Sequence, residues 1–184
     1  MKSGFFVRAL LLTFLVAVTA LGGLRSALAA PSREKEAKAA LDALYETTPA
    51  AKALGAKAKA ILVFPDIRKG GFILGGQFGE GVLLKNGKLA GRYRVEGLLV
   101  GLEAGAQSFA YTIFFMSDAA LEKMRTTHGL EIGTDPNIVV VDSGAAKEIT
   151  TGTAPADVYA YVFNQKGLMG GISVQGLKFT EIER

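Results

Sequence analysis

The chain has 184 residues, 49% of them hydrophobic, with one histidine, no cysteine and no tryptophan, and its formal net charge is +4. Without cysteine there can be no disulfide or thiolate metal site, and one histidine cannot build a histidine-based metal cluster. Three of the basic residues, Lys2, Arg8 and Arg25, lie before residue 30 with no acidic residue among them, so the rest of the chain carries only +1. A charge this small does not favour nucleic-acid binding.

Residues 1–29 have the three parts of a secretory signal peptide. A basic start, "MKSGFFVR", precedes the apolar run "ALLLTFLVAVTALGGL", and small residues at Ala27 and Ala29 suit a cleavage site. We expect cleavage after Ala29, which leaves residues 30–184 as one domain in the periplasm or secreted, peripheral on a membrane. The alternative is an uncleaved anchor, although the run is shorter than the roughly 20 residues of a spanning helix.

Two helices are expected next. Residues 32–47 have apolar side chains at helical spacing, and Ser32 can cap the first turn. Thr48 offers a second cap and Pro49 suits a first helical position, so an alanine-rich helix should follow and run to about Lys59.

Short strands are predicted from there. "AILVF" is an apolar run that we expect to end as a buried strand at Pro65. Asn86-Gly87, between extended flanks, is typical of a tight hairpin turn. Further strands are expected near 91–105 and 109–116.

The remaining pattern predicts a helix and then more strands. Ser117 can cap the helix "DAALEKMRTTHG", which should end at Gly129, and "NIVVVD", "DVYAYVF" and "GISVQGLKFTEI" follow as strands. The alternation slips at Gln175-Gly176, which we interpret as a bulge. The expected class is α+β: two N-terminal helices packed on a glycine-rich, mostly antiparallel coiled sheet or small barrel, with one inserted helix.

The stretch "GGFILGGQFGEG" raises the question of a nucleotide-binding loop. A Walker loop needs Lys and Ser or Thr after its last glycine, but Gln77 follows Gly76 and Val82 follows Gly81. A dinucleotide fingerprint must open a helix, and here a hairpin follows. We therefore interpret the glycines as structural positions where a strand bends or another chain segment packs closely.

Three ordered motifs carry a family resemblance. "AKAILVFPDIRKGGFILGGQFGEGVLL", "GLEAGAQSFAYTIFFMSDAALEKM" and "VFNQKGLMGGISVQGLKF" resemble the SYLF-domain family over residues 50–180. The resemblance implies a lipid-binding domain, since eukaryotic relatives bind phosphoinositides, partly through an amphipathic N-terminal helix, and some bind actin. Bacterial relatives are exported, and many have a lipid-anchor cysteine that this chain lacks. An exported chain of this type is not expected to meet actin.

The basic residues concentrate in one segment. Residues 49–69 contain five basic residues against Asp66 alone. Such clusters attract anionic membranes, although the apolar positions of the expected second helix are mostly alanine, which inserts weakly. The predicted lipid-binding residues are Lys52, Lys57, Lys59, Arg68 and Lys69.

We expect a non-enzymatic protein that docks on an anionic phospholipid surface through the second helix and the adjacent turn, without cofactor, metal or nucleic acid. A solvated basic face without lipid is the plain alternative. The second functional hypothesis is a non-catalytic envelope scaffold that binds a protein partner or a small apolar ligand.

Catalysis has little support in the sequence. His128 lies beside a predicted helix end, where it can bond terminal carbonyls, and Ser143 is not in a nucleophile elbow. Glu80, Glu96 and Glu103 could pair as acid and base, but glutamates on the outward face of strands are far more common.

Overall fold

The computed structural model describes residues 32–127, 129–130, 138–142 and 156–183. All helices and strands described belong to one unit, Arg33–Arg184. His128 and Ser143 lie outside the described residues, as does the predicted signal peptide.

The first predicted helix is confirmed and the second is shorter than expected. Helix α2 spans Arg33–Thr47 and helix α3 spans Pro49–Gly55. Thr48 precedes α3 but makes no side-chain cap hydrogen bond. The prediction that α3 reaches Lys59 is wrong, because α3 ends at Gly55 and the Lys59 N–H already donates to the Phe115 carbonyl of β2.

Long strands replace several of the short predicted ones. The strands are β1 (Ala60–Lys85), β2 (Lys88–Phe115), β3 (Gly129–Leu130), β4 (Ile138–Asp142) and β5 (Val158–Glu183). The expected stop at Pro65 is wrong. Pairing with β2 passes from Phe64 directly to Ile67, so proline sits in an irregularity where its missing N–H removes no ladder bond.

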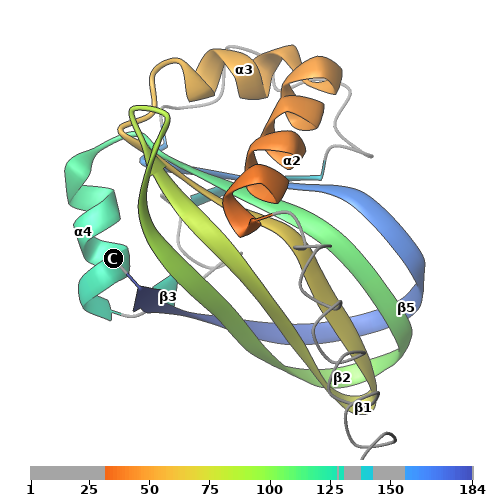
Figure 1. Cartoon of the computed structure of the whole chain (residues 1–184). Helices are drawn as coiled ribbons and strands as arrows, with labels where there is room; N and C mark the ends of the chain where they lie inside the picture. The colour runs from red at the N-terminus through yellow and green to blue at the C-terminus, as the bar shows by residue number, and fades with distance from the viewer. Residues whose placement is uncertain (1–31, 128, 131–137, 143–155, 184) are drawn as a thin grey trace, which may run out of the picture. The chain divides into compact units, whose positions relative to one another are not determined.

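The sheet order is β1-β2-β5-β3, with antiparallel pairs, and β4 pairs with β5 in parallel. Asn86 and Gly87 form the predicted turn with φ of 52° and 73°. The bulge expected at Gln175-Gly176 is wrong, since these residues keep continuous register opposite Leu99 and Leu98. The predicted α+β class with a coiled sheet is confirmed (Figure 1).

Strand β1 bends back on itself near Ile73, where φ is 66°. Phe72 pairs with Ala104 and Leu74 pairs with Val100, so one residue of β1 spans the bend while β2 uses three. Strand β1 therefore takes the inside of the curve, and its later half crosses its earlier half. A Cβ built on Gly81 would meet the Val63 carbonyl and would lie 2.6 Å from the Phe64 ring.

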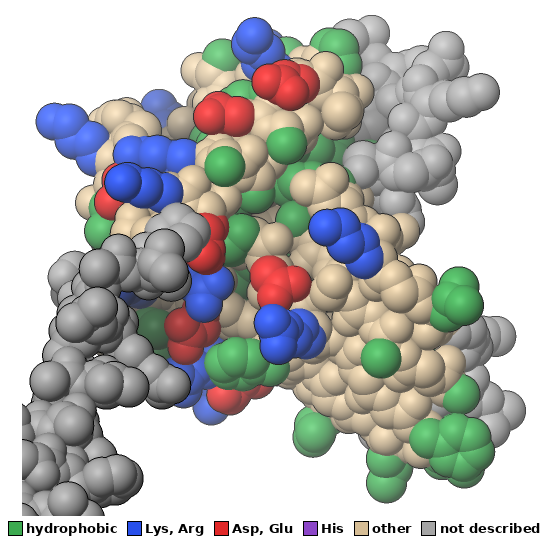
Figure 2. Space-filling model, turned by 45° about the vertical axis from the view of Figure 1, so that its right-hand side comes forward, with side chains coloured by type: hydrophobic (Ala, Val, Ile, Leu, Met, Phe, Trp, Pro, Cys, Tyr) green, Lys and Arg blue, Asp and Glu red, His purple; other side chains and the backbone are tan. Residues whose placement is uncertain are grey.

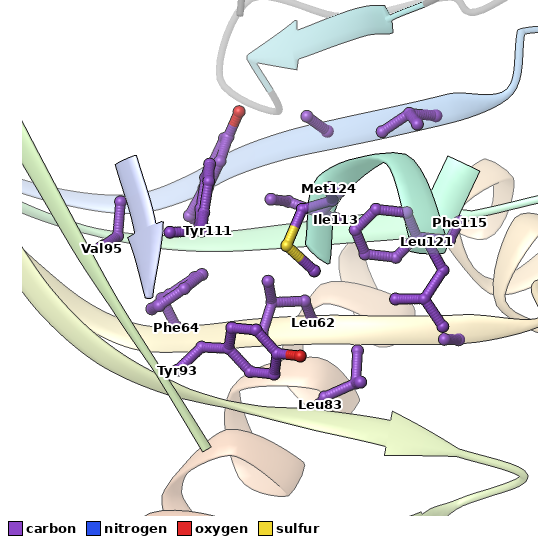
Figure 3. Packing of buried hydrophobic residues seen from close by; sticks show 14 of the residues in the cluster. Leu62, Phe64, Leu83, Tyr93, Val95, Tyr111, Ile113, Phe115, Leu121 and Met124 are labelled. Carbon is purple, nitrogen blue, oxygen red and sulfur yellow. The ribbon is translucent and has the colours of Figure 1, made fainter. Parts of the chain in front are cut away.

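The fold-back encloses the first hydrophobic cluster. Phe64 from before the bend packs on Phe179 of β5, with ring centroids 5.8 Å apart. Helix α4 (Asp118–Thr127) adds Leu121 and Met124 to this cluster (Figure 3). The Ser117 side chain accepts a hydrogen bond from the Ala120 N–H at 3.2 Å, which confirms the predicted cap.

A second cluster lies on the other face of the strands. It contains Leu41 and Leu44 of α2 together with Val63, Phe114 and Tyr161. The Phe114 and Tyr161 rings meet edge to face at 5.8 Å. Buried leucine and phenylalanine side chains contribute roughly 1.5–3 kcal/mol each, so the two clusters supply most of the stabilisation.

We predict that Gly81→Ala destabilises the fold and that Gly76→Ala does not. A Cβ at Gly81 would displace Val63 and Phe64, whereas at Gly76 the nearest atom is the Gly97 carbonyl oxygen at 3.6 Å, an ordinary contact. Urea unfolding should show a loss of about 1–3 kcal/mol for Gly81→Ala and less than about 1 kcal/mol for Gly76→Ala. Equal stability of both variants would contradict the crossing of β1 over itself.

The buried hydroxyl of Tyr111 should make the stability of the fold depend on pH. This hydroxyl is buried without a hydrogen-bond partner in the described part of the chain, and burial raises the pKa of Tyr111 above its ordinary value of 10.0. A raised folded-state pKa gives stability that is complete below about pH 10 and falls above it, by up to about 1.4 kcal/mol per pH unit.

The Tyr111→Phe variant should therefore keep its stability to within about 1 kcal/mol at about pH 8 and lose less than the wild type at about pH 11. Burial also raises the pKa values of Tyr45, Tyr93 and Tyr161, so part of the alkaline loss should remain. Guanidinium unfolding at both pH values measures this. Identical alkaline losses would mean that Tyr111 is not buried as described.

Candidate functional site

The predicted lipid-binding residues fall into two groups. Lys52 lies on α3, and Lys57 and Lys59 lie between α3 and β1; all three are exposed. They make no ion pair with any residue that the structure describes. We call these three residues the α3 group.

Arg68 and Lys69 lie farther along β1. Arg68 comes nine positions after Lys59, a path of about 30 Å along an extended strand. Arg68 is 83% exposed at its side chain and pairs with Asp66 at 3.1 Å. Lys69 is half-buried and has an interaction partner of its own. The structure therefore does not gather the five predicted residues into one site.

Strand β5 adds a further cation near Arg68, Lys166, which sequence analysis missed. Arg68 pairs with Ser108 of β2, and Ser108 pairs with Lys166 of β5. Residues paired across neighbouring strands point to the same face of a sheet. Lys166 is exposed and makes no ion pair with a described residue. We call Arg68, Ser108 and Lys166 the cation row.

Large hydrophobic side chains are exposed where the sheet bends. Phe72, Ile73 and Leu74 of β1 are 75%, 55% and 68% exposed, Leu98 of β2 is 77% exposed and Leu168 of β5 is 90% exposed. Figure 2 shows hydrophobic side chains projecting from one end of the sheet. We call these five residues the bend fringe. Sequence analysis missed it, although "FIL" between two glycine pairs was the available signal.

Glutamate side chains do not form an acid–base pair in the part of the structure described. Glu80 bonds to Arg94 at 3.2 Å and lies 4.0 Å from Arg33, so Arg94 and Arg33 stabilise its charge. Glu96 is exposed on β2, and the side chain of Glu103 lies outside the described residues. The described residues contain no group of three metal-ligating side chains.

A pocket of about 300 Å³ lies between α4 and the ends of β2 and β5. Arg125 donates a hydrogen bond from Nε to the Tyr93 hydroxyl at 3.2 Å. Burial raises the pKa of Tyr93, and the hydrogen bond to Tyr93 raises the pKa of Arg125. Glu122 and Glu181 also line the pocket, together with the apolar side chains of Met124 and Phe179, so it offers both polar and apolar surface.

No helix in the described ranges is long and apolar enough to cross a membrane. The fold and this surface are those of a small α+β domain with a curled sheet, a helix-covered face and an exposed apolar bend. The Ysc84 family model, described as "Las17-binding protein actin regulator", matches residues 96–184. Residues 96–184 thus match the SYLF (Ysc84) family, which confirms the predicted family over this part of the chain. A search of curated proteins finds no match.

Proposed function

We propose that this is an exported, non-enzymatic protein that docks peripherally on anionic membrane surfaces. The observation that carries the proposal is the exposure of cations that no described acid neutralises: the α3 group, and Lys166 in the cation row. Membership of the SYLF family is consistent with lipid binding. Anionic lipids attract such residues within about one Debye length, so the binding should be sensitive to salt.

Two surfaces could dock on the membrane, the α3 group and the cation row, and each can be tested separately. The α3 group comes before β1 and the cation row lies on β1, β2 and β5, so the charge of each group can be reversed without changing the other. One variant reverses the α3 group (Lys52→Glu, Lys57→Glu and Lys59→Glu). The other reverses the cation row (Arg68→Glu and Lys166→Glu).

We predict that the wild type sediments with vesicles of equimolar phosphatidylcholine and phosphatidylglycerol at about 0.05 M salt and is released at about 0.5 M. Reversal of at least one cation group should weaken binding about tenfold or more. The control is Lys85→Glu with Lys88→Glu, which changes the charge near the hairpin turn. The proposal fails if the wild type does not bind, or if the control weakens binding as much as both test variants do.

A second candidate function is a non-catalytic scaffold that binds a protein partner or a small ligand. The family is described as a Las17-binding actin regulator, which favours a protein partner for members of that family. The pocket beside Tyr93 and Arg125, which has both polar and apolar side chains in its lining, would be the place for a small ligand. Native mass spectrometry of the purified protein separates a retained lipid from a bound protein. Actin stays an unexpected partner for an exported chain.

A further inference from the structure

The cation row and part of the bend fringe share one outward face of the sheet. Side chains two residues apart on a strand point to the same side. Phe72 therefore shares a face with Arg68, and Leu168 shares a face with Lys166. Strand pairing puts Arg68 and Lys166 on the same face through Ser108.

This face is amphipathic along the strands. Leu168 lies two residues beyond Lys166, about 7 Å, and Phe72 lies four residues beyond Arg68, about 13 Å. The middle strand contributes only small side chains between them, at Ala104 and Ala106. The described side chains between these cations and the bend, residues 69–72, 104–107 and 167–168, include no acid, although Arg68 itself pairs with Asp66 at 3.1 Å.

The other side of the bend is apolar as well. Leu74 and Leu98 are exposed on the strands that leave the bend, and Ile73 lies at its apex. The bend fringe is thus the outer surface of the bend in the sheet and not the lining of a groove. A projecting apolar surface can insert into a lipid bilayer, whereas a groove is needed to receive a peptide or a helix.

We propose that the bend fringe inserts into the interface of an anionic bilayer, with Arg68 and Lys166 at the level of the lipid phosphates. Interfacial elements bury their apolar side chains roughly 5–10 Å into the headgroup and acyl boundary. The spacing between the cations and the nearer apolar side chains has this size, so both groups can contact lipid in a single orientation. The inference rests on the proposed function and assigns the docking to the bend and not to the α3 group.

The chain has no tryptophan, so one introduced tryptophan reports on a single position. Phe72→Trp places the probe in the fringe. Leu89→Trp is the matched control, because Leu89 is 39% exposed and lies beside the hairpin turn, opposite Leu84. Tryptophan emission is measured with vesicles of equimolar phosphatidylcholine and phosphatidylglycerol, with and without brominated acyl chains.

We expect the Phe72→Trp emission to shift to shorter wavelength on vesicle binding and to be quenched by brominated lipid, while the Leu89→Trp emission changes little. Phe72→Ser with Leu168→Ser should weaken binding about tenfold or more. Leu89→Ser with Ile182→Ser, a change at two other exposed hydrophobic residues, should keep the wild-type affinity. Circular dichroism melting of each variant checks that the fold is unchanged.

The outcomes separate the two proposals. If the wild type binds vesicles but Phe72→Trp is not quenched, docking occurs elsewhere and this inference is wrong, while the proposed function stands. If the wild type does not bind vesicles, the proposed function fails and this inference fails with it. If the Phe72→Trp emission shifts with protein concentration in the absence of lipid, a second copy of the chain covers the fringe, and the inference is likewise overturned.

Discussion

The structure depends on the close contact of β1 with itself. A strand of 26 residues would span about 85 Å if it were straight, far more than a domain of this size can hold. The strand instead turns at Ile73, and Gly81 crosses over Val63 and Phe64, where a larger residue would collide with them. This contact brings the two halves of the sheet together and encloses the first hydrophobic cluster between them.

The same constraint leaves the bend without internal partners. Side chains near Phe64 point into a core because the facing half of the sheet is close, but at the apex the chain only turns, so Phe72 and Leu74 face outward. Exposed apolar surface of this kind supports the membrane docking that we propose. The cations of Arg68 and Lys166 lie just behind it, which gives the surface the charge and polarity that a membrane interface requires.

The class, the hairpin turn and α2 could be predicted because each has a local cause: helical spacing, a capping residue or Asn86-Gly87. Strand lengths could not, because the irregularity that accommodates Pro65 is set by pairing with β2 and not by the residues themselves. The basic residues were visible in the sequence, but their division into two groups follows from the length of β1. Lys166 could be joined to Arg68 only through the register of three strands.

The most direct test of the fold-back is a distance between the two ends of β1. Because the chain has no cysteine, Lys59→Cys with Lys85→Cys accepts exactly two spin labels, and double electron–electron resonance measures their separation. Val63 and Val82 belong to one buried cluster, so the labels should lie within about 40 Å of each other. A separation near 85 Å would mean that β1 runs straight, and the account of the core and of the exposed bend would be wrong.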